Sequence, residues 1–525
     1  MNAAEFQFQL QKTVLFGACF AAAILVGLLL VGAPFMLVLG LFGVVWLMTL
    51  PYHSTISLYL ALVTLNSALI IPGLNGRPFW WELAAGLGWS GVVVLMALRR
   101  QTEGAGERIR KNWMLYLGIF GYCCVLLFLM YYRGVGIRAL GSDTANGQQG
   151  GRLYIQQIAC AIFPVLLALS PLNERSLVRL YIIQCLLSAT FLLSDLIFAY
   201  GRAFYDLLLF LELPADGINF ESQSVNFGLR RFQSLFALAV GMLSILWVKR
   251  PLRDYGNQMG VWMWPLTLVF LAIGLLSGHR HLLYLTFTMF AFNAWAQRFF
   301  TVSRVAALGV VAAIGYLLLF AYARELPLVA QRAISFVPGI EVDRVAYEDG
   351  LATMEGRRSL RRAGFEMASQ YRWVGRGFGK MTELDREQYR FDLTYLSADN
   401  GIFYNGTVGL LVNTGLPGTF FMFLALWAGS VLAWRIFQHI RIYGAEDDFS
   451  RFAVLQASWW SANVITFIFL HGDVEYALRW FAMPAGLMVA SAWHLSRRLD
   501  PGAQVVALVD SKKPAFVFRE PSQAY

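Results

Sequence analysis

The chain has 525 residues, of which 58% are hydrophobic and 14% are charged, and its formal net charge is +10. Soluble domains carry about a quarter charged residues, so this composition excludes an ordinary soluble protein and predicts an integral membrane protein. The excess positive charge is expected in loops that set membrane orientation. No nucleic-acid-binding motif accompanies it, so nucleic acid is not an expected partner. All five cysteines fall in apolar runs, which predicts neither disulfides nor a zinc site.

Apolar segments of membrane-spanning length recur along the chain. About fourteen can be counted, and because their ends are uncertain by about two to four residues we expect twelve to fourteen transmembrane helices. They cover residues 13–31, 35–50, 55–71, 80–98, 113–131, 153–170, 180–200, 232–248, 261–276, 282–295, 305–323, 408–434, 452–470 and 477–494. The sequence therefore predicts an all-α polytopic membrane protein.

Arginine and lysine concentrate in every second loop, which predicts that those loops and both termini are cytoplasmic. The chain then divides into N-terminal transmembrane helices (1–323), a large outer loop (324–405), C-terminal transmembrane helices (406–498) and a cytoplasmic tail (499–525). The outer loop mixes acids, arginines and aromatic residues, so it is expected to fold. Residues 355–371 have the pattern of an amphipathic helix within it. Gly415-Leu416-Pro417-Gly418 predicts a kink or break in the next helix.

Several arginines lie in the predicted outer loops, although basic residues normally concentrate in cytoplasmic loops. The guanidinium fork binds phosphate through paired charge-assisted hydrogen bonds, so these residues are candidates to hold a pyrophosphate. The candidates are Arg230 and Arg231 before a helix, Arg280 in a turn between helices, Arg357 at the start of the amphipathic helix, and Arg376 in a glycine cluster (375–379). They could equally pair with nearby acids or with lipid phosphates. The glycine cluster could cradle phosphate or form a bend that returns the loop to the membrane.

A group transfer to a hydroxyl also needs a general base. Asp399 and Tyr404 lie where the outer loop rejoins the membrane, and further carboxylate or imidazole candidates lie in two short outer turns: His279, His281, His471, Asp473 and Glu475. His279 and His281 lack an evident third ligand, so no metal is expected. No motif for ATP use or proteolysis is present, and no cofactor is expected.

Four stretches, in this order and spacing, resemble the O-antigen ligase and O-antigen/exopolysaccharide polymerase superfamily of bacterial envelopes. They are Arg230 or Arg231; Leu276-Ser277-Gly278-His279-Arg280; Gly356-Arg357 with 361–363 and Val374-Gly375-Arg376-Gly377-Phe378-Gly379; and Tyr404-Asn405 with Leu410-Leu411, Gly415 and Gly418. The resemblance covers most of the chain in architecture and its second half in motif.

The resemblance implies a metal-independent, multi-span (GT-C-like) glycosyltransferase of the bacterial inner membrane. Such enzymes take glycan from an undecaprenyl-pyrophosphate donor at the outer face. A ligase passes it to the lipid A core, and a polymerase passes it to another lipid-linked chain. The implied partners are that donor, an acceptor glycan or lipid, membrane lipids and envelope polysaccharide assembly proteins. The arginines would hold the pyrophosphate, and a loop residue would activate the acceptor hydroxyl.

The chain departs from the ligase pattern at the residue before the loop-end asparagine, where ligases have histidine and this chain has Tyr404. Tyrosine has a reference pKa of about 10, which makes it a poor base at neutral pH. Asp399, five residues earlier, would be the better base. The difference favours a polymerase-like member.

Two other functional classes fit the composition. A transporter or flippase of lipid-linked saccharide would be expected to show intramembrane charges and matching halves. Asp195 is the main intramembrane acid, and no internal repeat is visible. A non-catalytic subunit of an envelope assembly machine is the third possibility.

Overall fold

The computed structural model describes residues 35–72, 77–97, 104–133, 151–170, 172–212, 232, 234–256, 260–378, 401–470, 472 and 474–498. Within these residues the chain is all-helical and contains no β-strand. The helices of the N-terminal half are α2 (Phe35–Thr49), η1 (Leu50–Tyr52), α3 (His53–Thr64), α4 (Trp80–Ala97), α5 (Ala105–Lys111), α6 (Trp113–Tyr132), α7 (Gly151–Cys160), α8 (Ile162–Leu169), α9 (Glu174–Leu187), α10 (Ala189–Tyr200), η3 (Arg202–Leu209), α12 (Ser234–Lys249) and η4 (Leu252–Gly256).

The remaining helices comprise the last predicted N-terminal spans, the large predicted loop and the C-terminal spans. They are α13 (Gly260–Leu275), α14 (His281–Ala296), α15 (Val302–Tyr322), η5 (Ala323–Glu325), α16 (Leu328–Ile334), α17 (Arg344–Tyr371), α20 (Gly406–Tyr443), α21 (Asp448–Ile465), the π-helical η6 (Thr466–Leu470), η7 (Val474–Tyr476) and α22 (Ala477–Arg497). The expected amphipathic helix at 355–371 is the second half of α17, which begins earlier than the sequence indicated.

The prediction of a helical, multi-pass membrane protein is confirmed. Among the described residues, seven helices are long and apolar enough to cross a membrane. Every predicted span except the first falls on one of the helices above, and residues 13–31 lie outside the described part of the chain. None of the residues of α15 is buried, although its sequence is strongly apolar. A helix that is apolar on all sides and exposed in the protein suits a surface that faces lipid.

Short side chains fix where several of these helices begin. The side-chain oxygens of Asn173, Asp343, Asn405 and Asp447 each accept a hydrogen bond from a backbone N–H in the first turn of α9, α17, α20 and α21, at 2.6 to 3.0 Å. Such caps satisfy donors that the first turn of a helix leaves open. Asn405 is the asparagine of the Tyr404-Asn405 motif found in the sequence. In the structure this asparagine caps the start of α20.

The loops predicted to share one side of the membrane lie together at one end of the bundle. Arg498 at the end of α22 forms ion pairs with Glu174, the first residue of α9, and with Asp447 before α21. Lys249 at the end of α12 lies 2.5 Å from Asp448. The end of the predicted span 55–71 also meets the predicted outer loop after residue 200, since the backbone bridges Leu69 and Leu211. The loop topology, including which end faces the cytoplasm, stays a prediction.

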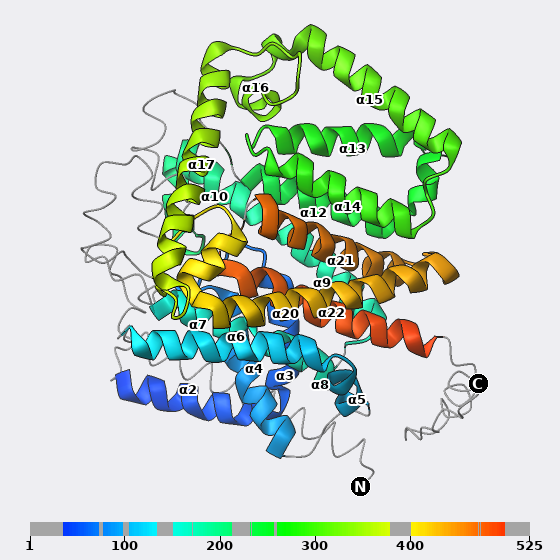
Figure 1. Ribbon diagram of the computed structural model, residues 1–525. Helices are drawn as coiled ribbons and strands as arrows, with labels where there is room; N and C mark the ends of the chain where they lie inside the picture. The colour runs from blue at the N-terminus through cyan, green and yellow to red at the C-terminus, as the bar shows by residue number, and fades with distance from the viewer. Residues whose placement is uncertain are drawn as a thin grey trace.

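Helix α17 lies across the end of the bundle. Figure 1 shows α6, α20 and α21 running roughly parallel, with α17 roughly perpendicular to them along one side of the molecule. Its Leu360, Ala363 and Met367 are buried against Phe403 and Val408 at the start of α20. Helix α17 therefore covers the bundle end where α20 begins.

Candidate functional site

The centre of the candidate site is a break in α20. Gly415 has φ 65° and ψ −173°, which interrupts the helix and confirms the predicted kink. In an unbroken helix the carbonyls of Val412 and Asn413 would accept bonds from residues 416 and 417. The break removes the first bond, and Pro417 has no N–H to donate the second. Both carbonyls therefore need other partners inside an apolar environment.

The chain that follows α17 supplies those partners. The N–H of Arg376 donates to the Val412 carbonyl at 2.7 Å, and the N–H of Gly377 donates to the Asn413 carbonyl at 2.8 Å. In return the Leu416 N–H donates to the Arg372 carbonyl at 2.6 Å. We call residues 372–378 the docked segment. The glycine cluster thus lies against the broken helix, which matches the interpretation of a bend that returns to the membrane.

Close backbone contact explains two of the glycines in this segment. A Cβ atom at position 375 would collide with the backbone of Asn413, and one at position 377 would collide with the Tyr154 hydroxyl. Gly377 also has a φ of 83°, which side-chain-bearing residues rarely adopt. Glycine is therefore required here for packing, independently of any phosphate.

Two residues from the first half of the chain hold the docked segment in place. Arg133, just after α6, donates from Nη2 to the Gly375 carbonyl at 2.7 Å. The hydroxyl of Tyr154 on α7 accepts the Phe378 N–H at 2.7 Å, and the two rings lie 5.0 Å apart. Neither residue was identified from the sequence as part of a site. No local signal marks Tyr154, because its contact depends on how α7 packs.

Arg376 is the predicted site residue that lies at this junction. It is 7% exposed, in the midst of the docked segment. Its Nη2 and the Asn413 side-chain oxygen both approach the position that a Cβ on Gly401 would occupy, each at 2.9 Å. Asn413 is fully buried and donates from Nδ2 to the Gly401 carbonyl at 3.0 Å. Arginine stays charged at any physiological pH, so a permanent positive charge lies beside the break.

Arg357 and Tyr404 form a pair beside the same end of α20. The Arg357 guanidinium lies 5.1 Å from the centre of the Tyr404 ring. Tyr404 has a φ of 47°. That left-handed conformation is uncommon for a tyrosine and costs about 1–3 kcal/mol, and such strain clusters at functional sites. The two predicted residues are therefore brought together by folding.

Arg280 lies elsewhere, at the α16 end of α17. Its Nε donates to the Arg332 carbonyl at 3.2 Å, and its Nη2 donates to the Ser335 hydroxyl at 2.7 Å. Arg332 in turn donates from Nη1 to the Gly278 carbonyl at 2.7 Å and forms a buried ion pair with Asp349. These reciprocal bonds fasten the 277–280 turn to α16 and α17. The structure places Arg280 in this contact and not beside Arg376.

The other candidates are distributed as follows. Arg230, Arg231, Asp399, His471 and Asp473 lie outside the described residues. The His281 ring stacks on Phe236 at 5.4 Å, and the His279 ring meets the same phenylalanine at 6.2 Å. Across the described part of the chain, no three histidine, cysteine or acidic side chains are grouped to hold a metal ion.

No protein-family model matches the chain, and no curated protein matches it significantly. The resemblance to the ligase and polymerase superfamily therefore stays a prediction from the motifs, and the function is inferred from the residues of the site.

Proposed function

We propose that this protein is a glycosyltransferase of the polymerase or ligase type that uses an undecaprenyl-pyrophosphate-linked glycan as donor. The observation that carries the proposal is the buried side chain of Arg376, whose backbone N–H donates to the Val412 carbonyl at the break in α20. A broken helix with a charged group at the break is a rare and costly arrangement in an apolar bundle. Arg357, on α17, lies over the ring of Tyr404 just before the start of α20.

The proposed chemistry is displacement at a sugar. The acceptor hydroxyl attacks the anomeric carbon, the bond from that carbon to the pyrophosphate oxygen breaks, and the hydroxyl proton passes to a general base. Negative charge grows on the departing pyrophosphate, and a fixed guanidinium stabilises it without reorganisation. Arg376 has that role in the proposal, with Arg357 as a second cation.

Asp399 is the proposed base, because carboxylates are ordinarily ionised at neutral pH whereas phenols, with a reference pKa of about 10, are not. Tyr404 is proposed to contact the substrate instead. Gly401, only two residues after Asp399, lies beside Arg376, so the chain passes close to the proposed leaving-group site. Arg230, Arg231 and Arg280 are proposed to contribute further phosphate contacts, although Arg280 lies apart from Arg376 and fastens its turn to α16.

The remaining features of the proposal follow the resemblance. The protein would lie in the bacterial inner membrane with the large loop in the periplasm, act without metal or cofactor, and add glycan to an acceptor glycan or lipid with help from envelope polysaccharide assembly proteins. Tyr404 in place of histidine favours the polymerase over the ligase.

The test is chain extension by the full protein in lipid nanodiscs, with an undecaprenyl-pyrophosphate-linked repeat unit as the only substrate. We expect longer chains without ATP and in the presence of EDTA. Arg376→Ala should lower the rate by about 10²–10³, the usual effect of removing one donor that stabilises a developing charge. The matched control is Arg372→Ala in the same segment. Its side chain is exposed, and the bond to Leu416 uses only its backbone carbonyl. Equal rates for the two variants would refute the role of Arg376.

The break in α20 also favours a second candidate, a transporter or flippase, because discontinuous helices form the substrate sites of many transporters. Asp195 gives this candidate little support, since its carboxylate accepts the Ser234 N–H at 3.2 Å and so caps the start of α12. A transporter would move labelled lipid-linked saccharide across a proteoliposome membrane and leave its chain length unchanged.

A further inference from the structure

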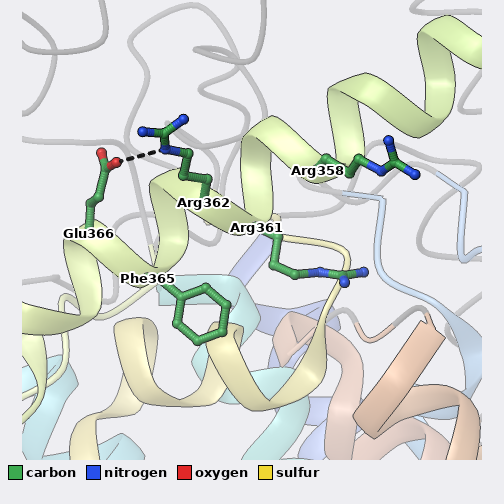
Figure 2. Close-up of a pocket in the computed structure, with 5 residues that line it drawn as sticks. All are labelled: Arg358, Arg361, Arg362, Phe365 and Glu366. Atoms are coloured by element: carbon green, nitrogen blue, oxygen red, sulfur yellow. Dashed lines mark ion pairs between the residues drawn. The ribbon is translucent and has the colours of Figure 1, made fainter.

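The second half of α17 carries a basic stripe that the proposed reaction does not use. Arg358, Arg361, Arg362, Phe365 and Glu366 line an open hollow of about 430 Å³. Their spacing of three and four residues places them on one face of the helix. Figure 2 shows these five side chains along α17, with Glu366 and Arg362 directed toward each other. We call this set the α17 stripe.

The α17 stripe faces away from the transmembrane helices. Leu360, Ala363 and Met367 on the other side of α17 are buried against the start of α20. Because α17 crosses the end of the bundle (Figure 1), its outer face, which is exposed, is directed away from the bundle. Acyl chains surround the sides of such a bundle rather than its end. A ligand of the α17 stripe is therefore expected to come from the aqueous side.

The stripe is cationic and its charges are available. Three guanidinium groups and one carboxylate line the hollow, which leaves two positive charges in excess. An ion pair within the stripe joins Arg362 Nε and Glu366 Oε1 at 3.5 Å, and these side chains are 85% and 51% exposed. Exposed pairs of this kind contribute little free energy, so an incoming anion can replace the carboxylate of Glu366 at small cost.

Phe365 adds an aromatic surface among the arginines. Its side chain is 61% exposed, an unfavourable position for a phenyl ring that has no ligand. The apolar C–H face of a pyranose ring can stack on such a ring, since aromatic side chains combine a large apolar area with a negatively polarised face. Guanidinium forks on either side match the geometry of carboxylates.

We propose that the α17 stripe binds an acidic polysaccharide, with carboxylates on the arginines and a sugar ring on Phe365. The identification of this polysaccharide with the glycan that the protein elongates rests on the proposed function. Binding itself does not depend on it and can be measured without any reaction.

The test uses the full protein in nanodiscs of zwitterionic lipid and a fluorescent α-1,4-linked hexagalacturonate, with neutral maltohexaose as the comparison. Binding of each oligosaccharide is followed by fluorescence anisotropy at several salt concentrations. The variant that removes the stripe's charge is the triple substitution Arg358→Gln, Arg361→Gln and Arg362→Gln. The control removes the same charge elsewhere, by Arg253→Gln, Arg324→Gln and Arg344→Gln, whose side chains are all exposed and each pair with a glutamate. Thermal unfolding of both variants establishes that they are folded.

The expected result is hexagalacturonate binding that weakens with added salt, with Kd raised about tenfold or more by the stripe variant and changed less than about twofold by the control. Phe365→Leu should weaken hexagalacturonate binding as well, because the carboxylates depend on the ring to position the sugar. Equal Kd values for the stripe and control variants would overturn the proposal, as would maltohexaose binding as tightly as hexagalacturonate.

Three further outcomes distinguish this proposal from a lipid-headgroup site and from the glycosyltransferase proposal. If phosphatidylglycerol vesicles bind through the stripe and hexagalacturonate does not, the stripe is a lipid-headgroup site and the proposal fails. If hexagalacturonate binding depends on the stripe but the protein elongates no lipid-linked glycan, the stripe proposal stands and the glycosyltransferase proposal fails. Elongation of a neutral repeat unit, with no binding of hexagalacturonate, would support the glycosyltransferase proposal and overturn the stripe proposal.

Discussion

The substitution Gly415→Ala tests the link between the break in α20 and the docked segment. Gly415 has a φ of 65° and a ψ of −173°, a conformation that is essentially restricted to glycine. An added Cβ would lie 2.8 Å from the Gly375 nitrogen and 2.8 Å from the Trp373 carbonyl oxygen. Both atoms belong to the docked segment, so the methyl group and the segment compete for the same space.

The expected cost can be worked from these contacts. Alanine in this conformation is strained by about 1–3 kcal/mol. The strain and the collision burden the docked state of the variant, whereas the three backbone hydrogen bonds of docking are lost on release in both proteins. The variant should therefore destabilise docking by about 1–3 kcal/mol, which is a shift of roughly 5- to 150-fold in the docking equilibrium.

Limited trypsin digestion with mass spectrometry measures this shift directly. Arg376 is buried in the docked segment, so cleavage after it should be slow in the wild-type protein and much faster in Gly415→Ala. The control is Gly309→Ala in α15, where an added Cβ would meet nothing within 4 Å. That variant should leave the cleavage rate unchanged and stabilise its helix slightly. Equal cleavage in the two variants would refute the reasoning that the break holds the segment.

Three further predictions concern Arg376, Arg332 and Glu212. Arg376→Lys should lower chain extension nearly as much as Arg376→Ala, because an ammonium cannot reproduce the guanidinium fork; rates close to wild type would show that charge alone suffices. Arg332→Met removes the ion pair of the largely buried Asp349 and should lower the free energy of unfolding by about 3–5 kcal/mol. Denaturant titration measures this change, and a value below about 1 kcal/mol would contradict a structural role for the pair. Burial raises the pKa of Glu212 above its ordinary value, against the opposing charges of Arg479, Arg152 and Arg77. The folded chain then binds this proton more tightly than the unfolded chain, so the contribution of Glu212 is full below about pH 4.5 and is lost as pH rises through the raised pKa. Glu212→Gln should therefore gain stability relative to wild type as pH increases from about 4 to 7, and parallel pH curves for the two proteins would refute this.

Most of the helices could be predicted from the sequence, because a bilayer imposes a length and a composition on each span. Gly415 and Pro417 marked the break in α20, since each residue has a backbone property that an unbroken helix does not accept. Helix α17 was found only in part. Its first half mixes charged and small residues, and it becomes a helix through the Asp343 cap and through contacts with α16.

The candidate site was less accessible to such reasoning. Arginine as a residue type could be associated with phosphate. The sequence pattern, however, does not distinguish the roles of Arg280, Arg357 and Arg376. Folding separates them: Arg280 joins α16, Arg357 lies on Tyr404, and Arg376 lies at the break. Tyr154 and Arg133 could not be identified at all, because their partners are more than 200 positions away along the chain.

The amino-acid sequence alone determined that this is a helical, multi-pass membrane protein with a break in α20, because hydrophobicity and chain-breaking residues act locally. The tertiary structure decided which carbonyls at the broken helix find donors, which arginine is enclosed beside them, and which face of α17 remains open to water. Those outcomes depend on contacts between segments that are distant along the chain. The local sequence of either segment does not indicate such a contact.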